Sequence, residues 1–148
     1  MGNTSVKFIF AKKLPEGILP ATEFKKNAVK LINDVFSLEN GICHNLNLLF
    51  CGDDRIIEYN RKYLNHDYET DVITFRYQDD TVDSDMIIST DTVKRNAEKF
   101  GTDFMCEIYR VIIHGVLHIC GYDDNDTAGK IKMRKKENKY LKLTGNVL

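Results

Sequence analysis

The sequence predicts an α+β domain in which one mixed β-sheet of about four strands packs with about five helices. Short runs rich in β-branched and aromatic residues alternate with longer segments whose apolar residues recur every three or four positions. Two strands with helical connections come early, a hairpin follows, and three helical segments end the chain. No linker-like change in composition divides the 148 residues, so we expect residues 1–148 to form a single domain.

The first half of the chain supplies two strands and two helices. Residues 6–10 and residues 46–51 are short β-rich runs. Between them, Thr22 is placed to cap a helix that ends near residues 40–41. The apolar residues of this helix recur at helical spacing: Phe24, Ala28, Leu31, Ile32, Val35 and Phe36. A second helix is predicted over residues 52–64, and its apolar side consists of Ile56, Ile57, Tyr59 and Tyr63.

The second half begins with the hairpin and ends in helices. Residues 70–75 predict the third strand, the acidic residues 78–85 its turn, and residues 86–88 the fourth strand. Asp91 is placed to cap a helix that runs to Phe100. A long apolar helix follows over residues 104–120, and the last helix covers residues 127–143.

Residues 104–120 are apolar nearly all round, as expected of a helix buried inside the domain. Their polar side chains are Glu107, Arg110, His114 and His118, which fall within a sector of roughly 80° at about 100° per residue. We expect this stripe to line a cleft. Because an unpaired buried charge is costly, we also expect Glu107 and Arg110 to pair with each other or across that cleft.

The segment from His114 to Asp124 reads His-x-x-x-His-x-x-Gly-x-x-Asp. Two histidines four positions apart share a helix face, and Gly121 is suited to a left-handed turn that returns Asp124 toward them. This is the ligand spacing of the metzincin metalloproteases, and it predicts a zincin-like metal site on a buried central helix, with His114, His118 and Asp124 as ligands. Gly115 stands where those proteases carry their glutamate base, which disfavours proteolysis and favours metal-assisted hydrolysis of another bond.

Composition narrows the classes of function. A formal net charge of −1 gives no global attraction to nucleic acid, so RNA contact requires a local patch. The last helix is strongly basic, with Glu137 as its one acid, and is equally well explained as an RNA-binding stripe or a solvated face. Four cysteines without a Cys-x-x-Cys pair, the lack of a signal peptide and the lack of a long apolar run predict a cytoplasmic protein without a membrane partner.

Three segments together resemble the YbeY endoribonucleases, a family of bacterial rRNA maturation factors. They are residues 114–123 (HGVLHICGYD), which resemble the family signature, residues 70–75 (TDVITF), which resemble its Thr-Asp-Val-Leu-Ser-Phe strand, and residues 84–89 (SDMIIS), which resemble its Gly-Asp-Ile-Val-Ile-Ser strand. The resemblance implies a metal-dependent, single-strand-specific endoribonuclease that acts in 16S rRNA 3′-end maturation and ribosome quality control. It implies one Zn²⁺ per chain, with rRNA and the small ribosomal subunit as partners. We expect a monomer.

Two positions depart from the family pattern. The third ligand is typically histidine where this chain has Asp124, and Leu64 replaces an arginine to which the family assigns a part in catalysis. An aspartate ligand lowers the formal charge of a zinc site from +2 to +1, which weakens the Lewis acid and raises the pKa of bound water. Two histidines and a carboxylate also suit iron, manganese or nickel, so the sequence leaves the metal open.

Catalytic and substrate-binding residues also stay open at this stage. Asp85, His66 and Arg110 are candidates for a catalytic role, and their plainer interpretations are a strand acid, a loop histidine and a buried ion-pair partner. Thr70 and Asp71 are candidates for contacting RNA, although alternation along a strand gives each even odds of facing the cleft. Two other functions remain, namely a small-subunit assembly factor that does not cut RNA and a metallohydrolase of another phosphoester.

Overall fold

A computed structural model describes residues 3–15, 20–77 and 83–145 of the chain. Within them the elements are β1 (Ser5–Phe10), α1 (Ala21–Leu38), β2 (Asn45–Cys51), α2 (Asp53–Leu64), β3 (Val72–Arg76), β4 (Asp83–Ser89), α3 (Thr90–Phe100), α4 (Phe104–Ile119) and α5 (Thr127–Leu141), followed by a 3₁₀ turn at Lys142–Thr144. The predicted α+β class, with one mixed sheet and helices packed on it, is confirmed.

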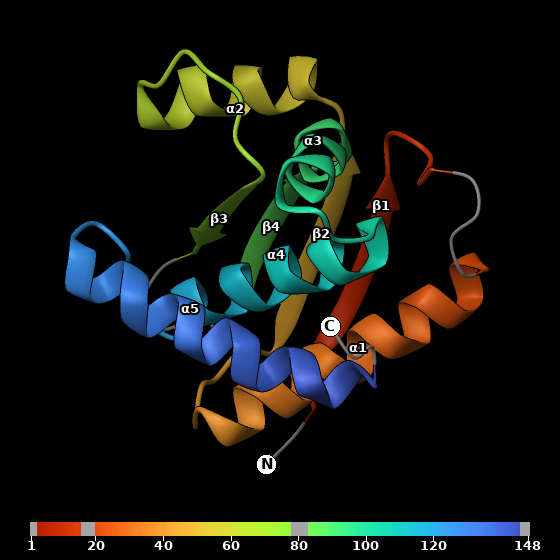
Figure 1. Ribbon diagram of the computed structural model, residues 1–148, viewed down its shortest axis with the longest axis vertical. Helices are drawn as coiled ribbons and strands as arrows, with labels where there is room; N and C mark the ends of the chain where they lie inside the picture. Colours follow the sequence, from red (N-terminus) through yellow and green to blue (C-terminus); the bar gives the residue numbers. More distant parts are fainter. Residues whose placement is uncertain (1–2, 16–19, 78–82, 146–148) are drawn as a thin grey trace.

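The described strands form one sheet in the order β1-β2-β4-β3. β1, β2 and β4 are parallel, and β3 lies at the edge, antiparallel to β4. Parallel strands need a crossover connection, which α1 provides between β1 and β2. In Figure 1, α1, α4 and α5 lie on one side of the sheet, and α2 lies at the top of the view. Side chains of α2 pack on the opposite face of the sheet. The larger apolar core fills the first side, and a smaller cluster lies under α2.

α4 lies in the middle of the larger core, as its apolar sequence predicts. It contacts α1, α3 and α5 as well as β3 and β4, so nearly every side of the helix is covered. Figure 1 shows it crossing the face of the sheet between α3 and α5. It has 16 residues. Among the described residues, no helix has the length and apolar character needed to cross a membrane.

Both predicted helix caps are wrong. α1 begins after Pro20, and Thr22 lies inside its first turn with no capping hydrogen bond. α3 is capped by Ser89, whose Oγ accepts from the Thr92 N–H at 3.3 Å. Asp91 instead accepts a hydrogen bond from the N–H of Asp53 at 3.0 Å and forms an ion pair with Lys12. The aspartate therefore ties α3 to the start of α2 and to the end of β1, which sequence spacing does not reveal.

The acidic segment is partly strand rather than turn. β4 begins at Asp83, where its pairing with β2 starts opposite Asn45. The side-chain amides of Asn45 and Asn47 also donate to the carboxylates of Asp83 and Asp85, each at 2.9 Å. Residues 78–82 of the predicted turn lie outside the described residues. β3 begins two residues later than predicted, at Val72, so residues 70 and 71 precede the strand.

The apolar side of α2 is also narrower than predicted. Ile56 is fully buried, but Tyr63 is 54% exposed. Asn60 is the buried side chain in this part of the helix, and its Nδ2 donates to the carbonyl of Tyr68 at 2.8 Å. This hydrogen bond attaches the second half of α2 to the loop that leads into β3. The spacing of apolar residues cannot indicate such a contact, because a polar side chain makes it.

Candidate metal centre

The start and the middle of α4 fix how its polar stripe is presented. Asp103 caps the helix, with its Oδ1 accepting from the Cys106 N–H at 2.7 Å. Gly115 faces β4, and a Cβ built there would lie 2.6 Å from Cε of the fully buried Met86. A glutamate at this position would have to enter the core. Any side chain here would require Met86 to move, and the acid-base group of the metzincin glutamate has no counterpart at this position.

The end of α4 closes in the left-handed turn that the glycine predicts. Gly121 has φ of 104°, its N–H donates to the carbonyl of His118 at 3.0 Å, and the Tyr122 N–H donates to the carbonyl of Leu117 at 3.1 Å. This pair of bonds is a Schellman motif, which reverses the chain over the last helical turn. The reversal brings Asp124 to the two histidines.

The three predicted ligands come together. The Nε2 atoms of His114 and His118 lie 2.9 Å apart. The Asp124 carboxylate places Oδ2 3.4 Å from Nε2 of His114 and Oδ1 3.6 Å from Nε2 of His118. Zinc-to-nitrogen bonds of about 2.0–2.1 Å in a tetrahedron imply ligand atoms roughly 3.3 Å apart. Within the described part of the chain, these side chains are the group of three whose ligand atoms converge closely enough to hold an ion.

The outer nitrogen of each ring is engaged, which sets the tautomers. His114 Nδ1 lies 2.8 Å from Oε2 of Glu137, and His118 Nδ1 lies 2.9 Å from the carbonyl oxygen of Tyr122. Since both partners accept, each Nδ1 carries the hydrogen and each Nε2 offers its lone pair. When both rings are neutral, two lone pairs and a carboxylate face one another, and a cation between them relieves their repulsion. This donor set fits a divalent metal ion.

Glu137 joins the ligand stripe to α5. Its side chain is 7% exposed and also accepts from Nη1 of Arg110 at 3.1 Å, while Arg110 reaches Oδ1 of Asn138 at 3.0 Å. Burial raises the pKa of Glu137, but the hydrogen bond and charge of His114, together with Arg110, outweigh burial and lower it. The same glutamate, against the opposing effect of burial, raises the pKa of His114. Arg110 thus helps to position Glu137, and it also lines the cavity beside His114.

A cavity of 350 Å³ opens beside His114. Its wall includes carboxylates and cations from four elements or loops: Asp71, Glu107, Asp124, Lys130 and Arg134. Burial raises the pKa of Asp71, although the charge of His114 opposes the shift, and burial likewise raises the pKa of Glu107. Nε of Arg110 is 3.9 Å from Oε1 of Glu107, so the predicted pairing along the helix exists but is looser than the bond to Glu137.

A second cavity, of 280 Å³, lies beside His118. Leu64, His66 and Thr70 line it, together with residues of β3. The ligand group therefore lies between two cavities, one holding Asp71 and the other Thr70. Both residues face the cleft because they precede β3, so the strict alternation of a strand does not apply to them. Leu64, at the position where the sequence departs from the family pattern, also lines the cavity beside His118.

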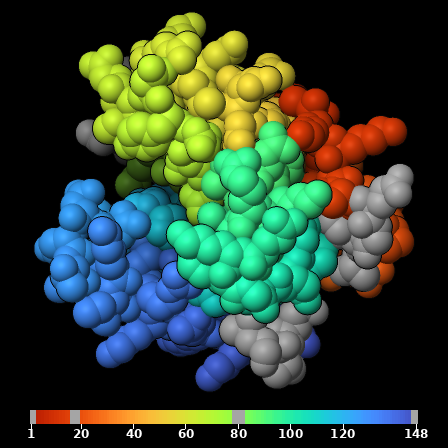
Figure 2. Space-filling view, turned by 45° about the horizontal axis from the view of Figure 1, so that its top comes forward, coloured from red at the N-terminus to blue at the C-terminus, as the bar shows by residue number. Residues whose placement is uncertain are grey.

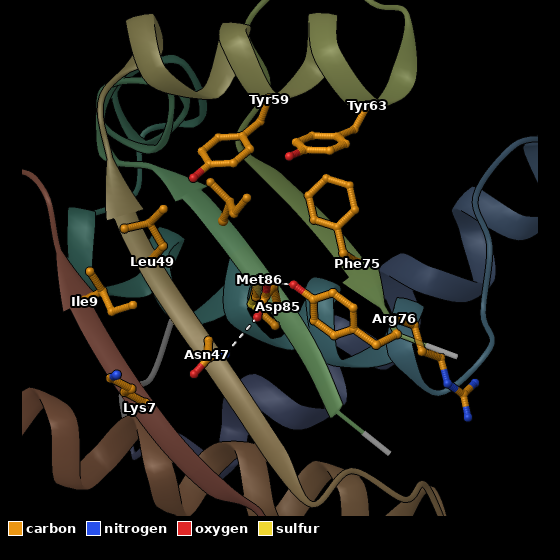
Figure 3. Close-up of a pocket in the computed structure, with 12 residues that line it drawn as sticks. Lys7, Ile9, Asn47, Leu49, Tyr59, Tyr63, Phe75, Arg76, Asp85 and Met86 are labelled. Atoms are coloured by element: carbon orange, nitrogen blue, oxygen red, sulfur yellow. Dashed lines mark hydrogen bonds between the residues drawn. The ribbon is translucent and has the colours of Figure 1, made fainter. Parts of the chain in front are cut away.

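Asp85 is not part of this group. It lies on the opposite face of the sheet, where its carboxylate accepts from Asn47 and from the hydroxyl of Tyr77. Figure 3 shows it in a cavity that β-strand residues share with Tyr59 and Tyr63 of α2. This cavity has a volume of 480 Å³ and contains none of the three ligands. The neighbouring Met86 points the other way, to α4, as alternation along β4 requires.

The class of protein is therefore an α+β domain with a cluster of three side chains that could hold one metal ion. The cluster is built on α4 and the turn that follows it, and a polar cavity lies on each side of it. The model of the family Endoribonuclease YbeY matches residues 14–145. The chain belongs to that family, which confirms the resemblance seen in its sequence.

The chain is also similar to named members of this family and to a solved structure. The Endoribonuclease YbeY of Bacteroides thetaiotaomicron is 40% identical over 129 residues, covering 86% of this chain and 94% of that protein. The Endoribonuclease YbeY of Parabacteroides distasonis is 42% identical over 130 residues, covering 84% and 88%. The solution structure of TM1509 from Thermotoga maritima superposes with a TM-score of 0.66 at 25% identity, covering 94% of this chain and 88% of that one.

Proposed function

We propose that this protein is a metal-dependent endoribonuclease specific for single-stranded RNA, acting on rRNA in 16S 3′-end maturation and ribosome quality control. The observation that carries the proposal is the convergence of His114, His118 and Asp124 between two polar cavities in a chain of the Endoribonuclease YbeY family. The proposed functional unit is the whole chain as one domain and a monomer. A ribosomal substrate and four free thiols support a cytoplasmic location.

Zn²⁺ is the proposed ion, held by the two Nε2 atoms and the Asp124 carboxylate. A bound divalent ion would supply Lewis acidity and an activated water for attack on a phosphodiester. The protein's part is to fix both imidazoles through Glu137 and the Tyr122 carbonyl, with Nδ1 of each ring turned to its partner and Nε2 directed at the ion. Because the ligand set also suits iron, manganese and nickel, the test below reloads the protein with one metal at a time.

Asp71 is the proposed proton acceptor. It lines the cavity beside His114 as a largely buried carboxylate that interacts with the charge of that ring, and burial raises its pKa toward the range useful for accepting a proton. Thr70 and His66, in the cavity beside His118, are proposed to contact the RNA strand on the other side. Lys130 and Arg134 border the first cavity and provide positive charge for phosphates.

Cleavage of a labelled single-stranded RNA by protein stripped with a chelator and then reloaded with a single metal tests the proposal. Wild type is expected to cut the single strand and to spare a duplex of the same sequence, whereas His118→Ala should lose both metal and cleavage. His44→Ala is the matched control, because His44 is exposed and lies outside both cavities. Metal-loaded protein that binds small subunits without cutting RNA would instead indicate an assembly factor. Cleavage of a small phosphodiester but not RNA would indicate another hydrolase.

A further inference from the structure

Glu39 is a buried carboxylate far from the metal ligands in sequence and close to their turn in space. It lies at the C-terminal end of α1, and its side chain is 6% exposed. Oε1 accepts from the hydroxyl of Tyr122 at 2.5 Å, and Oε2 accepts from Nζ of Lys136 at 2.9 Å and from the hydroxyl of Tyr140. Three donors from two other parts of the chain thus converge on one carboxylate.

The three donors do different things. Lys136 and Tyr140 belong to α5, so their bonds tie α5 to α1. Tyr122 belongs to the turn after α4, two residues before the ligand Asp124. Nζ of Lys136 also lies 5.1 Å from the centre of the Tyr122 ring, and Nζ of Lys132 lies 5.2 Å from it, so both lysines of α5 make cation–π contacts with the ring.

Tyr122 is held at both ends. Its hydroxyl is bound to Glu39, and its backbone carbonyl accepts from Nδ1 of His118 at 2.9 Å. The segment after α1 packs tightly on the same turn, since a Cβ on Gly41 would lie 2.6 Å from Sγ of Cys120. The carbonyl that orients a ligand ring is therefore set by an anchor on another helix.

We propose that Glu39 and Tyr122 form a positioning clamp that fixes the tautomer and direction of His118 and the placement of Asp124, and so sets metal affinity. The inference rests on the metal centre of the proposed function. Tyr140 supplies the matched comparison, because it donates to the same carboxylate but has no bond to the turn. A purely structural role for Glu39 predicts equal consequences for the two tyrosines, whereas the clamp predicts unequal ones.

The test compares Tyr122→Phe with Tyr140→Phe by competition for Zn²⁺ against a chromogenic chelator. Loss of an outer partner of a metal ligand typically weakens binding by about 10–100-fold. Phe keeps the carbonyl that accepts from His118 and removes only the bond that holds it in place. We therefore expect Tyr122→Phe to bind Zn²⁺ about tenfold more weakly, the low end of that range, and Tyr140→Phe to stay within about twofold of wild type. Equal losses in the two variants, or an unchanged affinity in Tyr122→Phe, would overturn the clamp.

A second readout needs no metal. The ¹⁵N shifts of the His118 ring in the metal-free protein report which nitrogen carries the hydrogen. Wild type and Tyr140→Phe should show hydrogen on Nδ1, and Tyr122→Phe should show a mixture of tautomers. A uniform Nδ1-H tautomer in all three proteins would contradict the clamp. If wild type bound no metal, the proposed function would fail, while this tautomer comparison would still decide the clamp.

Discussion

Replacing Glu137 by glutamine probes the contact that orients His114. The carboxylate accepts from Nδ1 of His114 at 2.8 Å and from Arg110 at 3.1 Å, and it is 7% exposed. An amide has one acceptor oxygen, so it cannot serve both donors, and its NH₂ must face one of them. Losing an outer partner of a metal ligand costs about 10–100-fold in affinity, which is about 1.4–2.7 kcal/mol. Arg110 also loses a negatively charged partner and keeps at most a neutral one, which should destabilise the apo protein by about 2 kcal/mol.

Glu107→Gln is the matched control for Glu137→Gln. It removes the same charge from the same cavity, but Glu107 contacts Arg110 and no ligand ring. Zn²⁺ affinity by chelator competition and urea unfolding of both apo variants measure the two effects separately. The reasoning is refuted if Glu137→Gln binds Zn²⁺ as tightly as wild type, or if Glu107→Gln weakens binding as much.

Three further predictions follow from other parts of the structure. The pKa of Glu39 is lowered to about 2, because its three hydrogen bonds outweigh burial. The ionised carboxylate therefore stabilises the fold above its ordinary pKa of 4.5, and this contribution is lost as the pH falls toward 2. In acid unfolding, the difference in stability between wild type and Glu39→Gln should shrink by about 3 kcal/mol over that range, and a constant difference would contradict the shift. Leu64→Arg places a cation in the cavity beside His118, so RNA affinity should rise and its logarithmic salt slope steepen by about one, whereas an unchanged slope would show that the strand does not pass there. Asp71→Asn should lower the RNA cleavage rate by about 10²–10⁴-fold with metal content unchanged, and a near-normal rate would remove Asp71 as proton acceptor.

The ligand group was predictable because its geometry is local. Four-residue spacing on one helix fixes His114 relative to His118, and a glycine turn three residues later fixes where Asp124 returns. These relations hold whatever the rest of the fold does. The order of strands and helices was predictable for the same reason, since periodicity is read within single segments.

The features that the sequence did not reveal depend on contacts between residues that are far apart in the chain. Glu137 is 23 residues from His114, and Glu39 is 83 residues from Tyr122. The only sequence signal for Glu137 was that a single acid stood in a basic helix, and Glu39 gave no signal at all. Asp85 was a reasonable catalytic candidate until the register of β4 placed it on the other face of the sheet, where Asn47 lies opposite it. The predicted cap at Asp91 was wrong for a similar reason, because its carboxylate pairs with Lys12 and accepts from the N–H of Asp53 instead.

Metal content tests the central claim most directly. Wild type, Asp124→Ala and Asp123→Ala would be purified without chelators, reloaded with Zn²⁺ and subjected to elemental analysis. Asp123 is the matched control, because it is an exposed neighbour whose carboxylate accepts from the Asn125 N–H at 3.1 Å and joins no ligand group. We predict about one ion per chain in wild type and Asp123→Ala and its loss in Asp124→Ala. Wild type that stays metal-free, or Asp124→Ala that keeps a full complement, would contradict the His114, His118 and Asp124 centre.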